Sequence, residues 1–194
     1  MDFTQARTYG GVGALLSFMG YIGTIMFPGS IILSVIGAIL ILVAVRMISS
    51  ELEDEPIFTN YLISFILGIT SIAVLFAGLI VAGLSLFGAS ILGLITSIVV
   101  FGVAFILLEI ASAFFLWRSY KRISSGTGVQ LFETVGLLYF IGALTLVIIV
   151  GMLVSFIAAI LEIVAYFSLP FKLEKSQSKD EGRPEVVGYE PDPS

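Results

Sequence analysis

The chain has 194 residues, of which 58% are hydrophobic and only 12% are charged, and its formal net charge at pH 7 is −5. This composition excludes an ordinary soluble domain, in which about 25% of residues are charged. The acidic balance gives no support to nucleic-acid binding, which needs a basic surface. Together with a mean hydropathy of +1.13, the composition predicts an integral membrane protein in contact with the lipid bilayer.

Three long stretches contain no Asp, Glu, Lys or Arg: residues 8–45, 56–108 and 134–161. A helix of about 20 apolar residues crosses the hydrocarbon core of a membrane, so each stretch has room for more than one crossing. The apolar residues occur in long runs without the alternation of a barrel strand, which favours helices.

Turn-forming residues divide these stretches. Pro28 and Gly29 interrupt the first, glycine and serine residues within 83–90 interrupt the second, and Gly151 marks the division of the third. Pro170 ends the last helix. The pattern predicts an all-α, polytopic transmembrane helical bundle of about six helices in three hairpins, at residues 9–26, 30–48, 56–82, 91–117, 131–150 and 152–169.

The nine basic residues predict the orientation of these helices. With six crossings they all fall on one side of the membrane, and the opposite turns carry no charge. Positive charge is retained on the cytoplasmic side during insertion. We therefore expect a multi-pass protein of the cell membrane with both termini in the cytoplasm.

Residues 1–171 form the predicted transmembrane domain. Residues 172–194 change abruptly to Lys, Glu, Asp, Ser, Gly and Pro, and such a segment cannot bury enough apolar surface to fold alone. We expect it to be a flexible, acidic cytoplasmic tail. The chain has no cysteine and therefore no disulfide or thiolate chemistry.

An internal repeat relates residues 47–68 to residues 122–142. In each segment an Ile-Ser-Ser sequence is followed by a polar loop, and Phe58 or Phe132 opens the next helix. The second and third hairpins are therefore predicted to be copies in the same orientation, related by an axis roughly normal to the membrane.

Two glutamates interrupt apolar runs in the same local frame, Glu109 in LLEIASAFF and Glu162 in ILEIVAYFS. They lie eight residues before Trp117 and Pro170 respectively, which predicts the same depth for both, about 12 Å inside the cytoplasmic boundary. A carboxylate at this depth must point into protein or a wet cavity, because an ionised carboxylate that faces lipid costs a few kcal/mol.

Two interpretations of this candidate intramembrane polar site remain open. Neutral carboxyl groups of Glu109 and Glu162 could hydrogen-bond neighbouring helices and fix their packing. Alternatively, the pair could form a proton or cation site. Tyr139 and Ser17 are expected at nearly the same depth and could offer hydroxyl donors. Arg118 lies on the opposite helical face from Glu109, so no salt bridge is expected within that helix.

Small residues recur at helical spacing in three of the predicted helices. Such faces are typical of contact between helices rather than contact with lipid. The predicted helix-packing residues are Gly10, Gly13 and Gly20 with Ser17 in the first helix, Gly102 beside Glu109, and Gly151, Ser155, Ala158 and Ala159 beside Glu162.

The polar segments carry little recognisable chemistry. The acidic run at residues 51–55 lacks the glycine and the spacing of a calcium loop, so we interpret it as a solvated loop and expect no metal. The chain has no histidine, and its polar segments contain no nucleophile elbow or phosphate loop. We therefore expect no cofactor and no enzymatic activity.

Several segments carry a family resemblance, among them YGGVGALLSFMGYIGTIMFPGS, SYKRIS and FETVGLLYFIGALTL. Over roughly residues 8–170 the pattern resembles the uncharacterised prokaryotic, mainly archaeal, membrane protein family catalogued as domain of unknown function 996. The resemblance implies a multi-spanning membrane topology, and it supplies no catalytic residues.

Two functions are consistent with these features. The favoured prediction is a non-enzymatic accessory or scaffold subunit, whose small-residue faces pack against another copy or a larger membrane complex. The alternative is a small proton- or cation-linked transporter or channel that uses Glu109 and Glu162.

Overall fold

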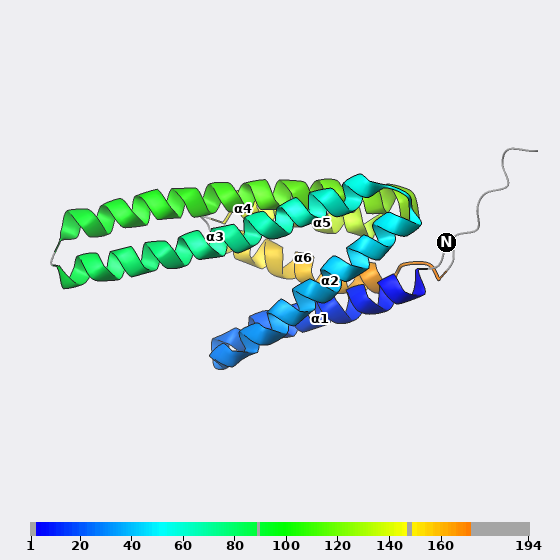
Figure 1. Cartoon of the computed structure of the whole chain (residues 1–194), viewed down its shortest axis with the longest axis horizontal. Helices are drawn as coiled ribbons and strands as arrows, with labels where there is room; N and C mark the ends of the chain where they lie inside the picture. The colour runs from blue at the N-terminus through cyan, green and yellow to red at the C-terminus, as the bar shows by residue number, and fades with distance from the viewer. Residues whose placement is uncertain (1–2, 89, 147–148, 172–194) are drawn as a thin grey trace, which may run out of the picture.

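A computed structural model describes residues 3–88, 90–146 and 149–171 of the chain. These residues form six α-helices and one short 3-10 helix, with no strand among them (Figure 1). The predicted all-α class is confirmed. The predicted tail, residues 172–194, lies outside the described residues. The elements are α1 (Thr4–Met26), η1 (Pro28–Ser30), α2 (Ile31–Glu51), α3 (Glu55–Phe87), α4 (Ile91–Thr127), α5 (Leu131–Leu144) and α6 (Ile149–Phe167).

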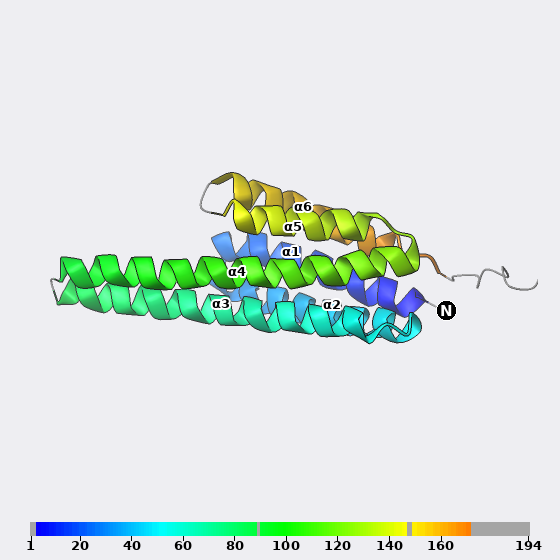
Figure 2. The ribbon, with the colours of Figure 1, turned by 90° about the horizontal axis from the view of Figure 1, so that it is seen from above.

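The helices form three antiparallel pairs, α1 with α2, α3 with α4, and α5 with α6 (Figures 1 and 2). Within the described residues, four helices are long and apolar enough to cross a membrane by length and composition: α2, α3, α4 and α6. Helix α5 is also apolar but has only 14 residues. This pattern agrees with a polytopic helical bundle.

The central pair is longer than the sequence predicts, because α3 has 33 residues and α4 has 37. The prediction ended α4 at Trp117, where the residues turn from apolar to polar. Arginine, lysine and serine do not break a helix, so α4 continues to Thr127. It ends where Gly128 adopts φ +76°, a left-handed conformation that glycine accepts without a steric penalty.

The break in the third pair lies earlier than predicted. Helix α5 ends at Leu144 and α6 begins at Ile149, so Gly151 is inside α6 rather than between the helices. Gly151 allows α6 to come close to the end of α5, because a Cβ atom at this position would lie only 2.5 Å from the carbonyl carbon of Thr145. Gly151 therefore lets α6 start directly against the end of α5.

The three pairs differ in length. At 1.5 Å per residue α3 and α4 are about 50 and 55 Å long, while α6 is about 28 Å. Figures 1 and 2 both show α3 and α4 extending well beyond the other helices at the end away from the N-terminus. We call this part the projecting hairpin (residues 73–87 of α3 and 91–107 of α4). The second pair, α3 and α4, is therefore longer than the third pair, α5 and α6. The prediction that the two pairs are copies is wrong for their lengths.

The buried core gathers at the opposite end, which we call the core end. Its largest fully buried side chains are Tyr120, Tyr166, Phe3 and Phe132. Among the described residues, no member of this buried cluster lies between Tyr61 and Tyr120. The described core is therefore built from α1, from the end of α2 and the start of α3, from the end of α4 and the start of α5, and from the end of α6. The projecting hairpin contributes no residue to it.

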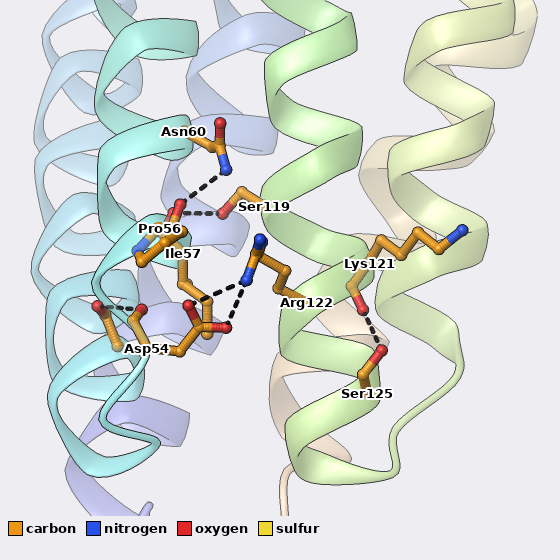
Figure 3. A network of polar contacts seen from close by, with 9 residues as sticks. Asp54, Pro56, Ile57, Asn60, Ser119, Lys121, Arg122 and Ser125 are labelled. Carbon is orange, nitrogen blue, oxygen red and sulfur yellow. Dashed lines mark hydrogen bonds and ion pairs between the residues drawn. The ribbon is translucent and has the colours of Figure 1, made fainter.

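Polar contacts tie the two long helices together at the core end (Figure 3). The side chain of Arg122 in α4 donates to both carboxylate oxygens of Asp54, at 3.1 and 3.2 Å. One turn before it, the Ser119 hydroxyl donates to the Ile57 carbonyl at 2.7 Å. The described basic residues all belong to helical segments near this end, which places the charged part of the chain opposite the projecting hairpin.

Candidate functional site

The buried carboxylate of Glu162 is the centre of the candidate site. Glu162 lies on α6 and is only 9% exposed. Tyr139 on α5 donates to Oε2 at 2.7 Å, and Tyr120 on α4 donates to Oε1. Both carboxylate oxygens therefore have a phenol donor, and the three hydrogen-bonded residues join three helices.

Two more tyrosines surround this arrangement. The hydroxyl of Tyr166 lies 3.3 Å from that of Tyr120, and the rings of Tyr61 and Tyr120 stack with their centroids 6.2 Å apart. Tyr166 follows Glu162 by four residues, so both side chains lie on the same face of α6. We call Tyr61, Tyr120, Tyr139 and Tyr166 the tyrosine cluster.

A cavity of about 370 Å³ lies beside Glu162, between α1, α2, α5 and α6. Its polar lining includes Glu162, Tyr139 and Ser17, and its apolar lining includes Phe18 and Phe156, whose ring centroids are 5.2 Å apart. The volume lies within the range of small-molecule sites. The structure thus brings three of the four predicted polar-site residues to one cavity.

Ser17 lines this cavity without contacting the carboxylate in any described hydrogen bond. Its hydroxyl donates to the carbonyl of Ser34, and the Ser34 hydroxyl donates to the carbonyl of Ser17, each at 3.4 Å. The reciprocal pair holds α1 against α2. Ser17 therefore shapes the wall of the cavity, whereas Tyr139 binds the carboxylate directly.

Glu109 belongs to a different part of the molecule and does not line the cavity. Its carboxylate accepts a hydrogen bond from the Ser71 hydroxyl across the α3–α4 pair. Ser112, three residues along α4, donates to the Ser64 carbonyl at 2.9 Å. These contacts resemble the hydrogen bonds between helices that hold membrane bundles together.

The two carboxylates are not level, in contrast to the prediction. Tyr120, which reaches Glu162, lies eleven residues after Glu109 on α4, and that interval corresponds to about 16 Å of helix. The prediction took Trp117 as the end of its helix, but Trp117 lies inside α4. The carboxylates therefore do not form one coupled pair in this arrangement.

The predicted packing residues fall into two groups. A Cβ atom added at Gly10, Gly13, Gly20 or Gly151 would come closer than 3.0 Å to a neighbouring helix or turn, but one added at Gly102 would meet nothing within 4 Å. On α6, Ala158 is fully buried and Ala159 and Ser155 line the cavity. All these positions except Gly102 therefore serve contacts or the cavity within the chain.

Sequence reasoning identified Tyr139 and Glu162 but missed Tyr120 and Tyr166. The spacing of four residues between Glu162 and Tyr166 was an available signal. Tyr120 sits beside Trp117 and Arg118, where an aromatic residue is typical of a membrane interface. Its burial depends on how α4 packs against α6, and no local pattern reveals that contact.

The chemistry of the site is that of a hydrogen-bonded carboxylate in an apolar setting. Such a group can bind a proton or a cation, and phenol donors stabilise its anionic form through charge-assisted hydrogen bonds. Among the described residues, no group of three or more His, Cys, Asp or Glu side chains could hold a metal ion.

Comparisons with known proteins find a family match and a similar archaeal protein. Residues 33–160 match a family model described as "Protein of unknown function (DUF996)". The chain is also 36% identical over 181 residues to an uncharacterized protein of Methanocaldococcus jannaschii, an alignment that covers 90% of this chain and 97% of the relative. No solved structure matches the chain. Neither description states an activity, substrate or partner.

Proposed function

Because the chain belongs to the DUF996 family of proteins of unknown function, we propose its role from its geometry: it is a non-enzymatic accessory or scaffold subunit of the cell membrane. In this proposal the helical pairs lie in the bilayer, and the projecting hairpin packs against another integral membrane protein. The core end faces the cytoplasm with both termini, because it carries the basic residues that are retained there during insertion.

The projecting hairpin is the observation that carries this proposal. It extends beyond the other four helices (Figures 1 and 2). Large apolar side chains of both α3 and α4 are exposed along it. At its tip Phe87 is 93% exposed and Leu92 is 77% exposed. Within residues 3–88, 90–146 and 149–171, no side chain covers them.

The length of the hairpin supports a protein partner in addition to lipid. The apolar part of α4, from Ile91 to Trp117, is about 40 Å long, whereas the hydrocarbon core is roughly 30 Å thick. A helix that exceeds the core tilts, thickens the bilayer or associates with other helices. Apolar tips outside the bilayer would otherwise contact water, which is unfavourable.

Gly102 supplies a second supporting feature. It lies on the projecting hairpin in α4, and a Cβ atom there would meet nothing within 4 Å in the part of the chain that the structure describes. A glycine lets a neighbouring helix come close. Gly102 therefore suits contact with a helix from another molecule, whereas Gly13 and Gly20 serve contacts between α1 and α2.

Affinity purification in a mild detergent tests the proposal. We expect the wild-type chain to co-purify with a membrane protein in a defined ratio, and Gly102→Trp to lose that partner while the chain itself stays folded. Tryptophan at Gly29, where a Cβ atom also meets nothing within 4 Å, is the matched control. A wild-type chain that is a lone monomer in native membranes after cross-linking would overturn the proposal, and the mass of the complex separates a second copy from a different subunit.

A second candidate function, a proton- or cation-linked transporter or channel, is favoured by a different observation. The Glu162 carboxylate adjoins a cavity, and its two oxygens are held by phenols. Transport predicts that vesicles containing the protein dissipate a proton or cation gradient, and that Glu162→Gln abolishes this flux. Unchanged flux in Glu162→Gln, or no flux in the wild type, would exclude the transport function.

A further inference from the structure

The hydrogen atoms of the Glu162 site can be counted from its contacts. Tyr120 and Tyr139 donate to the two carboxylate oxygens, so Tyr166 must be the donor in its contact with Tyr120. All three phenol hydrogens then find an acceptor. If the carboxyl group carried its own proton, four hydrogens would share these three contacts, and one of the four would have no acceptor within them. The network is therefore complete when Glu162 is ionised.

A nearby positive charge stabilises an ionised carboxylate in an apolar interior. Lys121 pairs with Glu133 and Arg122 pairs with Asp54, and neither of these ion pairs includes Glu162. The cavity that Glu162 lines is an open space at the carboxylate. A counter-charge brought by a ligand would enter there.

The other walls of the cavity indicate what kind of cation fits. Along α6 they run from Met152 to Glu162, about 15 Å of helix, and they include the rings of Phe18 and Phe156. Mg²⁺ and Ca²⁺ take six or more oxygen ligands, and this lining is mostly apolar. A carboxylate in a cavity whose other walls are apolar and aromatic suits an organic ammonium group that carries an alkyl chain.

We propose that the cavity between α1, α2, α5 and α6 binds a lipophilic ammonium compound, with the cationic group at Glu162 and Tyr139 and the apolar chain along Phe18 and Phe156. Met152 and Phe156 are 61% and 39% exposed, so the cavity opens on the side of the bundle. A ligand with an alkyl chain can enter from the bilayer. The proposal goes beyond the scaffold role and requires neither a protein partner nor transport.

Equilibrium binding of radiolabelled dodecyltrimethylammonium tests the proposal, with the protein in lipid nanodiscs and empty nanodiscs as the blank. We expect saturable binding of one ligand per chain, with competition by unlabelled ligand but not by dodecanol or dodecanoate, which share the chain length and lack the positive charge. Glu162→Gln should weaken binding at least about tenfold, the loss of roughly one charge pair. Glu109→Gln, a carboxylate outside the cavity, should leave it unchanged.

Three results would overturn the proposal: no saturable binding above the blank, equal competition by dodecanol, or equal binding by Glu162→Gln. A photoreactive alkylammonium on the unaltered chain keeps the test decisive if Glu162→Gln does not fold. Labelling of α1 or α6 around Phe18 and Phe156 supports the site, and labelling confined to the projecting hairpin contradicts it. These outcomes do not depend on whether a partner co-purifies, so the proposal and the scaffold role can fail separately.

Discussion

The core end and the projecting hairpin contain the same kinds of apolar residue but arrange them differently. At the core end, aromatic side chains such as Tyr120 and Phe132 are fully buried and contacted from several helices. In the projecting hairpin, residues such as Phe76 and Ile98 are 56% and 60% exposed, and only the seam between α3 and α4 is buried. The core end can therefore stabilise itself, whereas the hairpin depends on its surroundings.

The seam of the hairpin shows how little internal packing it has. Ser97 is buried there, and Gly78 approaches Phe101, whose Cβ would lie 2.5 Å from a Cβ atom added at Gly78. Small residues bring the two backbones close and leave the large side chains outside. This difference between the core end and the projecting hairpin means that high hydropathy alone does not show where the buried core of an apolar chain lies.

The largest expected effect is at the centre of the core end. Tyr120→Ala should lower the free energy of unfolding by about 3–5 kcal/mol, because it leaves a cavity the size of an aromatic ring and removes a donor from Glu162. Phe76→Ala in the projecting hairpin should change it by less than about 0.5 kcal/mol. Unfolding of the purified protein in mixed micelles can be followed by the fluorescence of Trp117, the single tryptophan. Equal effects of the two substitutions would remove the distinction between the two regions.

Replacing Gly13 or Gly102 with valine compares the two regions through the same chemical change. Gly13→Val should cost about 1–3 kcal/mol through overpacking, because a Cβ atom there would lie 2.8 Å from the Gly37 carbonyl oxygen on α2. Gly102→Val should be nearly neutral for the isolated chain, since its surroundings are open. The same unfolding measurement checks both variants, and a destabilised Gly102→Val would mean that α4 packs differently from this structure.

Hydrogen bonds within the long pair should have smaller effects. Ser71→Ala removes the donor to Glu109, and we expect a loss of about 0.6–1.7 kcal/mol, the range for hydrogen bonds between membrane helices. Thr70→Ala is the matched control, because the Thr70 hydroxyl donates only to the Ile66 carbonyl of its own helix. If both variants unfold alike, the contact between Ser71 and Glu109 does not stabilise the pair.

The smallest effect is expected at the charged surface of the core end. The ion pair between Arg122 and Asp54 joins side chains that are 45% and 30% exposed, at 3.1 Å, and exposed pairs contribute about 0–1 kcal/mol. A double-mutant cycle of Arg122→Ala and Asp54→Ala should give a coupling energy in that range. A coupling above about 2 kcal/mol would show that this end is held by charge more than by the aromatic core.

Much of this arrangement could be predicted from the sequence, because it depends on local patterns. Apolar runs divided by Pro28 and by the glycines before Ser90 predicted six helices, and the isolated carboxylates predicted buried polar contacts. The ends of α4 and α5 were missed, since a change in polarity at Trp117 does not end a helix and a glycine at position 151 can lie inside one. Helix ends depend on backbone conformation more than on hydropathy.

The candidate site was predicted only in part for a related reason. Predicting the relative depths of Glu109 and Glu162 requires the register between their helices. That register is set by the packing of Tyr120 and Phe132 at the core end. A single sequence gives no signal for such contacts between distant segments. Tyr139 was found because its depth could be counted from the start of its own helix.

The membrane orientation of α4 tests the central claim most directly, because the scaffold role requires this helix to cross the bilayer. The chain has no cysteine, so single cysteines at Ser125, near the end of α4, and Ser90, before its start, can be labelled with a membrane-impermeant maleimide. The account predicts that Ser125→Cys reacts from the cytoplasmic side and Ser90→Cys does not. Reaction of both cysteines from the same side would contradict it.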